Sequence, residues 1–182
     1  NGFTVEAGSG SHTNAEGNTY VAWNWKGGGD DVLNEVGDID SQVSANTAAG
    51  FSIVKWAGDS NSSSSVGHGL TVNSENMLVF IKDLDSSSSD WMVITNNLWT
   101  TPQQRFLKLN TTAAIATSGA NIYNVDNTTF KNSYRNTSGN DYIAYCWHSV
   151  AGYSKIGTYA GNSSTNKITL DFAPSWVMIK LY

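Results

Sequence analysis

Short stretches of alternating hydrophobic and polar residues recur along the whole chain, and YVAWNW at residues 20–25 is the first long one. These stretches are rich in β-branched and aromatic residues, and Gly, Asn, Ser and Asp clusters such as GDSNSSSS and DLDSSSSD separate them. The pattern predicts strands at residues 3–5, 20–25, 51–56, 77–82, 91–95, 105–109, 122–125, 142–147, 153–159, 168–172 and 176–182. About ten short strands with short connections favour an all-β fold, an antiparallel and jelly-roll-like β-sandwich that forms one domain over residues 1–182.

One segment, DDVLNEVGDID at residues 30–40, has the spacing of a helix instead. Val32, Leu33 and Val36 stand there at intervals of three and four, so we expect a short helix.

Three blocks of sequence occur twice. GNTYVAWNW at residues 17–25 returns as GNDYIAYCW at 139–147, AAGFS at 48–52 as VAGYS at 150–154, and LVFIK at 78–82 as WVMIK at 176–180. The blocks keep their order, which predicts an internal duplication with a pseudo-twofold axis. The first copy would cover about residues 3–110, and the second, shorter copy about residues 122–182.

The line that opens each copy has large residues on one face of a strand. In residues 20–25 these are Val21, Trp23 and Trp25. In residues 142–147 they are Ile143, Tyr145 and Trp147. We expect this face to line the interior of the sandwich, with both copies of the line in equivalent central positions. The alternative is an aromatic ladder on the surface.

Composition narrows the classes of partner. Neutral polar residues dominate, with 23 Ser, 20 Asn and 17 Thr, whereas charged residues make up 14% and the net charge is −5. A chain of this charge lacks the basic surface that a nucleic-acid backbone requires, and no run of residues is apolar for the length of a membrane span. The single cysteine, Cys146, allows no internal disulfide and is expected to be a small buried side chain.

Catalytic signatures are missing from the sequence, so we expect a protein that is not an enzyme. The chain holds no nucleophile elbow, zinc-protease motif, phosphate-binding loop or dinucleotide fingerprint. His12, His68 and His148 each stand alone; His68, between two glycines, is expected to cap a turn, and His148 to lie at the end of a core strand. A weaker alternative is a carbohydrate-active enzyme, which would need two acids across one cleft. The candidates are Asp30, Asp31, Glu35, Asp38, Asp40, Asp83, Asp85 and Asp90.

Calcium is the one cofactor that the acidic loops suggest. Asp38 with Asp40, and Asp83 with Asp85, have the alternate spacing that lets carboxylate oxygens converge on a hard cation. Neither pair lies within a complete calcium-loop motif.

Carbohydrate contact needs aromatic rings together with amide and hydroxyl groups. Trp99 lies in a turn-like stretch beside Asn97, and Trp56 ends a strand where its ring could project from the rim of the sandwich. Asp30 and Asp31 would add carboxylates from the acidic loop. Burial of both indoles against the sandwich is the alternative.

The segments YVAWNWKGGG, YIAYCWHSVAGYSKIGTYAGN and PSWVMIKLY resemble an uncharacterised β-rich domain that recurs in virion proteins of marine phages, in tail-associated and fibre-like polypeptides. The resemblance extends over nearly the whole chain and carries no catalytic residue with it. It implies an extracellular, virion-surface module that helps the particle attach to its host, and the composition favours glycans as the ligand. The alternative is a purely structural piece, a capsid-decoration or assembly protein whose partners are other virion subunits or further copies of itself.

Overall fold

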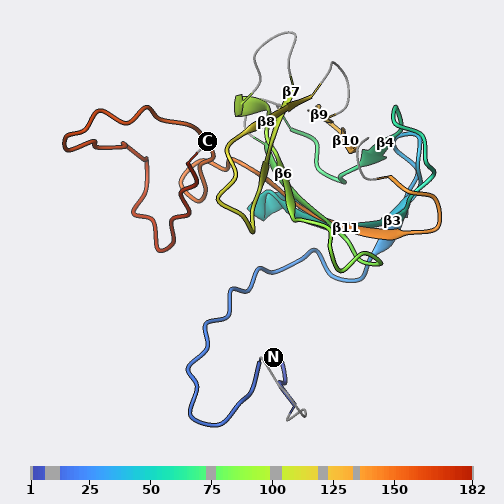
Figure 1. The fold of residues 1–182 in the computed structure, drawn as a ribbon, viewed down its shortest axis with the longest axis horizontal. Helices are drawn as coiled ribbons and strands as arrows, with labels where there is room; N and C mark the ends of the chain where they lie inside the picture. The colour runs from blue at the N-terminus through green and yellow to red at the C-terminus, as the bar shows by residue number, and fades with distance from the viewer. Residues whose placement is uncertain are drawn as a thin grey trace.

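The computed structural model of the chain is built almost entirely from β-structure (Figure 1). It describes residues 2–6, 13–72, 77–98, 104–118, 123–132 and 136–181. The strands in these residues are β1 (Val32–Asn34), β2 (Ser41–Asn46), β3 (Phe51–Ala57), β4 (Ser65–Gly67), β5 (Met77–Asp83), β6 (Met92–Ile94), β7 (Gln104–Lys108), β8 (Ala116–Ser118), β9 (Tyr123–Val125), β10 (Thr129–Asn132) and β11 (Asp141–His148). Two short 3₁₀ helices, η1 (Thr47–Ala49) and η3 (Asn96–Leu98), accompany them.

The strands form two antiparallel sheets that pack as a sandwich, which confirms the expected fold class. The larger sheet has the order β1-β2-β3-β11-β5-β6-β7-β8, and the smaller has the order β4-β10-β9. Strand β11 is the last in the sequence, yet it lies in the middle of the large sheet. It pairs with β3 on one side and with β5 on the other along nearly its whole length.

The core fills the space between the two sheets. On β11, the side chains of Tyr142, Ala144 and Cys146 are fully buried on the face that the small sheet covers. The ring of Trp56 on β3 stacks on Tyr142 at 5.4 Å and meets Phe130 of β10 edge-on at 5.3 Å. Ala144 and Cys146 of the central strand are small, and the large rings of Tyr142, Trp56 and Phe130 make up part of the same core.

Several expected elements differ from those observed. Residues 32–34 form β1 rather than a helix, because Val32 pairs with Val43 across the edge of the sheet. The pattern missed β2, β4, β8 and β10, which contain many Ser, Thr and Asn residues. Residues 3–5, 20–25, 153–159, 168–172 and 176–181 form no named strand, although their sequences predicted one.

The two copies of the aromatic line are not equivalent, so that expectation is wrong. Residues 142–147 lie in β11, whereas residues 20–25 lie outside any strand, with Val21 75% and Trp23 64% exposed. A similar pattern of side chains thus occurs in two environments: residues 142–147 have a paired strand on each side, and residues 20–25 lie in no strand.

The buried face of the line was also assigned to the wrong side. In β11 the partly exposed residues are Ile143, Tyr145 and Trp147, and the alternate residues are the buried ones. Alternation separates the two faces of a strand, but it does not identify the face against which the second sheet packs.

Much of each end of the chain extends away from both sheets, although Trp25 contacts Phe51 and Trp147 of the large sheet. Figure 1 shows the N-terminal residues, in blue, as a long trace beneath the sandwich, and the residues after β11, in red, as a loop to one side. Of the 18 exposed large hydrophobic residues in the described part of the chain, 14 lie before residue 26 or after residue 148. The sandwich itself buries its apolar residues well, and the two ends do not.

Candidate functional site

A row of aromatic rings lies on the outer face of the large sheet, opposite the core. It consists of Phe80, Trp91, Tyr145 and Trp147, all partly exposed, and we call it the aromatic face. The rings of Trp91 and Tyr145 are 6.1 Å apart and 29° from parallel, and those of Tyr145 and Trp147 are 6.3 Å apart and 26° from parallel. Phe80 meets Trp147 edge-on at 5.0 Å. Three rings of similar orientation thus follow one another along the sheet.

Strand pairing fixes this arrangement. Tyr145 of β11 stands opposite Phe80 of β5, and Phe80 stands opposite Val93 of β6, which places their side chains on one face of the sheet. Beside the row, Val93 and Leu107 are buried and form a second, smaller apolar cluster with the partly buried Phe80. The rings are therefore held at their bases by packing.

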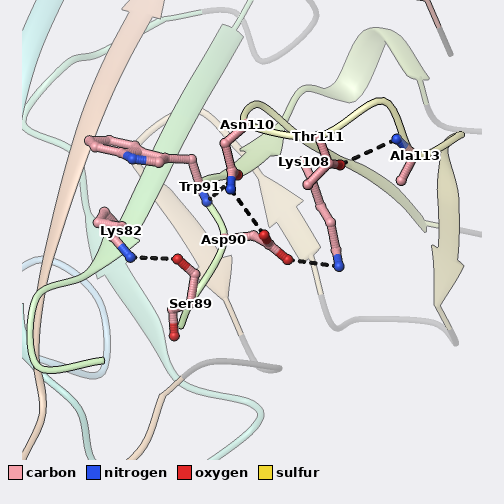
Figure 2. A network of polar contacts seen from close by, with 8 residues as sticks. All are labelled: Lys82, Ser89, Asp90, Trp91, Lys108, Asn110, Thr111 and Ala113. Atoms are coloured by element: carbon pink, nitrogen blue, oxygen red, sulfur yellow. Dashed lines mark hydrogen bonds and ion pairs between the residues drawn. The ribbon is translucent and has the colours of Figure 1, made fainter. Parts of the chain in front are cut away.

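A polar network holds Trp91 in place (Figure 2). Its backbone N–H donates to Oδ1 of Asn110 at 3.0 Å, and its carbonyl accepts from the N–H of Leu109 at 2.9 Å. Asp90 accepts from the Asn110 amide at 3.1 Å and pairs with Lys108 at 2.8 Å. Figure 2 shows the indole on the other side of the backbone from Asp90 and Lys108. The network uses the main chain of Trp91 and leaves its indole outside the polar contacts drawn.

Polar side chains border the aromatic face. Ile143 lies two residues before Tyr145 in β11. It pairs with Lys55 of β3 on one side and with Lys82 of β5 on the other. Lys55 forms an exposed ion pair with Asp141 at 3.0 Å, and Lys82 donates to the carbonyl groups of Ser86 and Ser89. Ammonium and carboxylate groups thus stand next to the rings, where they can form hydrogen bonds with a bound molecule.

Residues of both chain ends cover the other end of the row. Trp25 lies 5.7 Å from Trp147 and 6.4 Å from Phe51, which is only 3% exposed. Trp176 in turn meets Trp25 edge-on at 5.8 Å. Trp25 and Trp176 therefore cover the aromatic face on the side of Phe51.

The structure changes the picture of the predicted sugar-binding residues. Trp56 is only 4% exposed and belongs to the core, which corrects the expectation that it projects from the rim. Trp99 lies outside the described residues. Asn97 is partly buried in η3, where its amide contacts the Thr95 hydroxyl at 3.3 Å. Asp30 and Asp31 are exposed, far along the chain from these residues, and Asp30 borders a shallow depression between β1 and β2.

The first pair of predicted calcium ligands is used in the fold. A single oxygen of Asp38 accepts from the Ser65 hydroxyl at 2.7 Å and from the Ser65 N–H at 2.9 Å. These hydrogen bonds lower the pKa of Asp38 below its usual value. Asp40 is exposed and borders a second shallow depression.

The second pair is used in the same way. Asp83 is buried and accepts from the backbone N–H groups of Asp85 and Ser86 at 3.0 and 3.1 Å and from the Asn140 amide at 3.1 Å. Asp85 accepts from the N–H of Asp141. No group of three His, Cys, Asp or Glu side chains that could hold a metal ion occurs among the residues that the structure describes. Asp38, Asp83 and Asp85 thus accept hydrogen bonds from backbone amides, whereas Asp40 is exposed, and calcium binding at either pair stays a prediction.

The remaining titratable groups have structural positions. His68 is fully buried; its Nδ1 accepts from the N–H of Leu70 at 3.1 Å, so it caps a turn as expected, and burial lowers its pKa. His148 ends β11, also as expected, and His12 lies outside the described residues. Cys146 is buried as predicted, and burial raises the pKa of its thiol to about 12. Within the described ranges, no helix has the length and apolar character needed to cross a bilayer.

Comparison with known proteins places the chain in a family. A family model described as a domain of unknown function (DUF7483) matches residues 1–182. The chain belongs to this family. Searches of curated proteins and of solved structures gave no significant match.

For this DUF7483 domain, the sequence predicts part of the aromatic face, but it does not predict that this face is the outer one. Tyr145 and Trp147 were recognised as neighbours on one face, which was expected to be the interior. Phe80 alternates with the core residues Val79 and Ile81 in β5 and could have been found by the same reasoning. Trp91 could not, because its position beside Tyr145 depends on the pairing of β5 with β6.

Proposed function

We propose that this domain is a non-catalytic module that binds neutral glycans through the aromatic face. The observation that carries the proposal is the row of partly exposed rings from Trp91 through Tyr145 to Trp147, which have similar orientations. The apolar C–H groups of a sugar pack on aromatic rings, and successive rings along one line suit successive units of a chain. A patch of exposed aromatic side chains on a folded domain often marks a site of interaction.

The charge of the chain favours neutral over anionic polysaccharides. The net charge is −5, so a polyanion approaching the protein is repelled at long range. Close to the rings, the Lys55–Asp141 pair offers donors and acceptors to hydroxyl groups. Such a site binds one chain weakly, and display of many copies on one particle raises the overall avidity.

Affinity electrophoresis through gels that contain soluble β-glucan, xylan, mannan or dextran tests the proposal. We expect at least one neutral polysaccharide to retard the wild-type chain, and alginate to retard it less. Trp91→Ala is the decisive variant, because it removes the indole and keeps the backbone groups that bind Asn110 and Leu109. Tyr145→Ala removes the middle ring, and we expect both variants to lose the retardation.

Tyr159→Ala is the matched control, since Tyr159 is 46% exposed but lies outside the aromatic face. It should migrate as the wild type does. Absence of retardation by every neutral polysaccharide, or equal retardation of the Trp91→Ala variant and the wild type, would refute the proposal.

We place this module on the surface of a phage particle, in a tail fibre, adhesin or similar appendage. The support is the resemblance of segments such as YIAYCWHSVAGYSKIGTYAGN to domains of marine phage virion proteins. Immunogold labelling of purified particles from a phage that encodes the chain tests this placement. Gold on an appendage supports it, and unlabelled intact particles would refute it.

A structural role in assembly is the second candidate, and a separate observation favours it. Both chain ends expose large apolar residues that the sandwich leaves uncovered, among them Trp23 and Ile179 at 64% and 68%. Exposed apolar segments of this kind suit contacts with other protein subunits.

A further inference from the structure

A shallow depression lies beside the aromatic face, on the same outer side of the large sheet. Strand pairing places Leu33 of β1 opposite Gln42 of β2, and Gln42 opposite Lys55 of β3. Lys55 in turn stands opposite Ile143 of β11, two residues before Tyr145. Because alternate residues of a strand share a face, this line of side chains points to the same side as the rings.

The depression has a volume of about 240 Å³ and a mixed lining. Sites that enclose a drug-sized ligand have about 300–1,000 Å³, so this one suits a single sugar unit rather than a chain. Its apolar part is formed by Leu33, which is 57% exposed, and by Ala57 of β3. The polar residues around it include Asp40, Gln42, Lys55 and Asp141.

These polar side chains offer hydrogen-bond donors and acceptors together. The Lys55 ammonium pairs with Asp141 at 3.0 Å, and the two side chains remain 54% and 47% exposed. An ammonium has three N–H donors and a carboxylate has about four acceptor sites, so the ion pair leaves capacity for a ligand. The Gln42 amide adds a further donor and acceptor. A ligand group that both donates and accepts a hydrogen bond matches this set.

The charge of the depression disfavours acidic ligands. Asp40 and Asp141 carry two negative charges, and Lys55 carries one positive charge. A sulfate or carboxylate group would meet a net negative charge here, as it does over the whole chain, whose net charge is −5. An uncharged polar group is the better match.

We propose that this depression is a subsite for the acetamido group of a 2-acetamido sugar, so that the domain prefers neutral glycans built from N-acetylhexosamines. The methyl group packs on Leu33 and Ala57. The carbonyl oxygen accepts a hydrogen bond from Lys55, and the N–H donates to Asp141. A hydroxyl group lacks the methyl, and a free amine lacks both the methyl and the carbonyl. The inference rests on glycan binding by the aromatic face and adds the class of sugar to it.

The position of the depression suits a glycan that also contacts the rings. Lys55 lies on the strand next to β11 and two residues along the sheet from Tyr145. Neighbouring strands are about 4.8 Å apart and residues rise by about 3.3 Å, so the two positions are about 8 Å apart. A sugar chain that rests on Tyr145 can therefore reach the depression with a neighbouring unit.

Three tetrasaccharides of glucose-type units with identical linkages test the proposal, because they differ only in the substituent at the second carbon. N-acetylated chitotetraose carries acetamido groups, cellotetraose carries hydroxyl groups, and chitotetraose carries amines. NMR titration of the isotope-labelled chain with each sugar gives the affinity and the residues that respond. We expect the acetamido tetramer to bind about tenfold more tightly than cellotetraose, and it alone should shift the methyl signals of Leu33.

Variants assign this preference to the depression. Leu33→Ser removes the apolar wall at an exposed position, so it should weaken binding of the acetamido tetramer and leave that of cellotetraose unchanged. Lys55→Met removes the donor for the carbonyl oxygen and should weaken binding of the acetamido tetramer more than that of cellotetraose. Val36→Ser is the matched control, since Val36 is 47% exposed and lies outside the depression. Trp91→Ala, in contrast, should weaken binding of both tetramers.

The outcomes separate this inference from the proposal on which it rests. Equal affinity for cellotetraose and the acetamido tetramer would overturn the inference and leave glycan binding by the aromatic face intact. Tighter binding of the amine-bearing tetramer, or a preference that survives in Leu33→Ser, would overturn it as well. A tetramer that alternates N-acetylglucosamine with N-acetylmuramic acid separates cell-wall strands from uncharged polymers; its carboxylates should weaken binding, and the reverse order would overturn the assignment to neutral glycans. If no tetramer binds, the inference and the proposed function both fail.

Discussion

Truncation of Trp56 gives the sharpest test of the core. The indole is 4% exposed and contacts the rings of Phe130 and Tyr142 at 5.3 and 5.4 Å. A buried aromatic residue removes about 150–250 Å² from water, which at about 25 cal/mol per Å² corresponds to about 4–6 kcal/mol. Alanine retains part of this area, and measured losses for such substitutions are about 3–5 kcal/mol. We therefore expect Trp56→Ala to lower the free energy of unfolding by about 4 kcal/mol.

Trp23→Ala is the matched control, because it deletes the same side chain where the ring is 64% exposed. Its loss should be below about 0.5 kcal/mol, as for most surface substitutions. Urea unfolding of dilute protein, followed by far-UV circular dichroism, measures both values, with similar slopes expected for all three chains. A loss below about 1 kcal/mol for Trp56→Ala, or equal losses for the two variants, would show that the assignment of core and exposed faces is wrong.

The remaining predictions concern single groups. Because burial lowers the pKa of His68 below 6.5, the unfolded chain binds a proton more readily; stability should be full above pH 6.5 and fall as the pH drops below it. Urea unfolding at pH 7.5 and 5.5 should show a smaller loss in a His68→Gln variant, and equal losses would contradict this. Gly58→Ala should destabilise the fold, since its Cβ would lie 2.2 Å from a backbone oxygen, whereas Gly157→Ala meets nothing within 4 Å and should be neutral in thermal unfolding. Cys146, with its pKa raised to about 12, should react with a thiol reagent only after denaturation, and rapid labelling of the native chain would refute its burial.

Much of the fold followed from the sequence because period-two alternation is a local property of each strand. β3, β5 and β11 were expected within one or two residues of their observed ends. Residues 32–34 were assigned to a helix because a short apolar cluster fits both spacings, and only pairing with β2 decides between them. β4 and β10 carry few apolar residues, and they become strands through pairing with each other.

The choice of faces could not be made from the sequence, for a physical reason. Ala144 and Cys146 are small, and taken alone they indicate the outside of a strand rather than the core. They are buried in the same core cluster as the large rings of Trp56 and Phe130. The candidate site was missed for the same reason, since Tyr145 was expected in the interior that Tyr142 occupies.

The acidic residues show a similar limit. Alternate aspartates such as Asp83 and Asp85 fit a cation site as well as a turn, and the difference lies in the backbone N–H groups that reach them. The amide of Asp141, which donates to Asp85, comes from a segment distant in sequence, and the spacing of the aspartates does not report it.

The position of β11 also determines the order in which the protein can fold during synthesis. Strands β1–β3 and β5–β8 leave the ribosome first, and the edges of β3 and β5 that face each other have no partner until residues 141–148 emerge. Because these long-range pairs form last, the nascent chain exposes two apolar, hydrogen-bonding edges until that segment is synthesised. A strand from a neighbouring nascent chain can bind there first, so slow synthesis between β5 and β11 should favour misassembly between polypeptides made on one messenger.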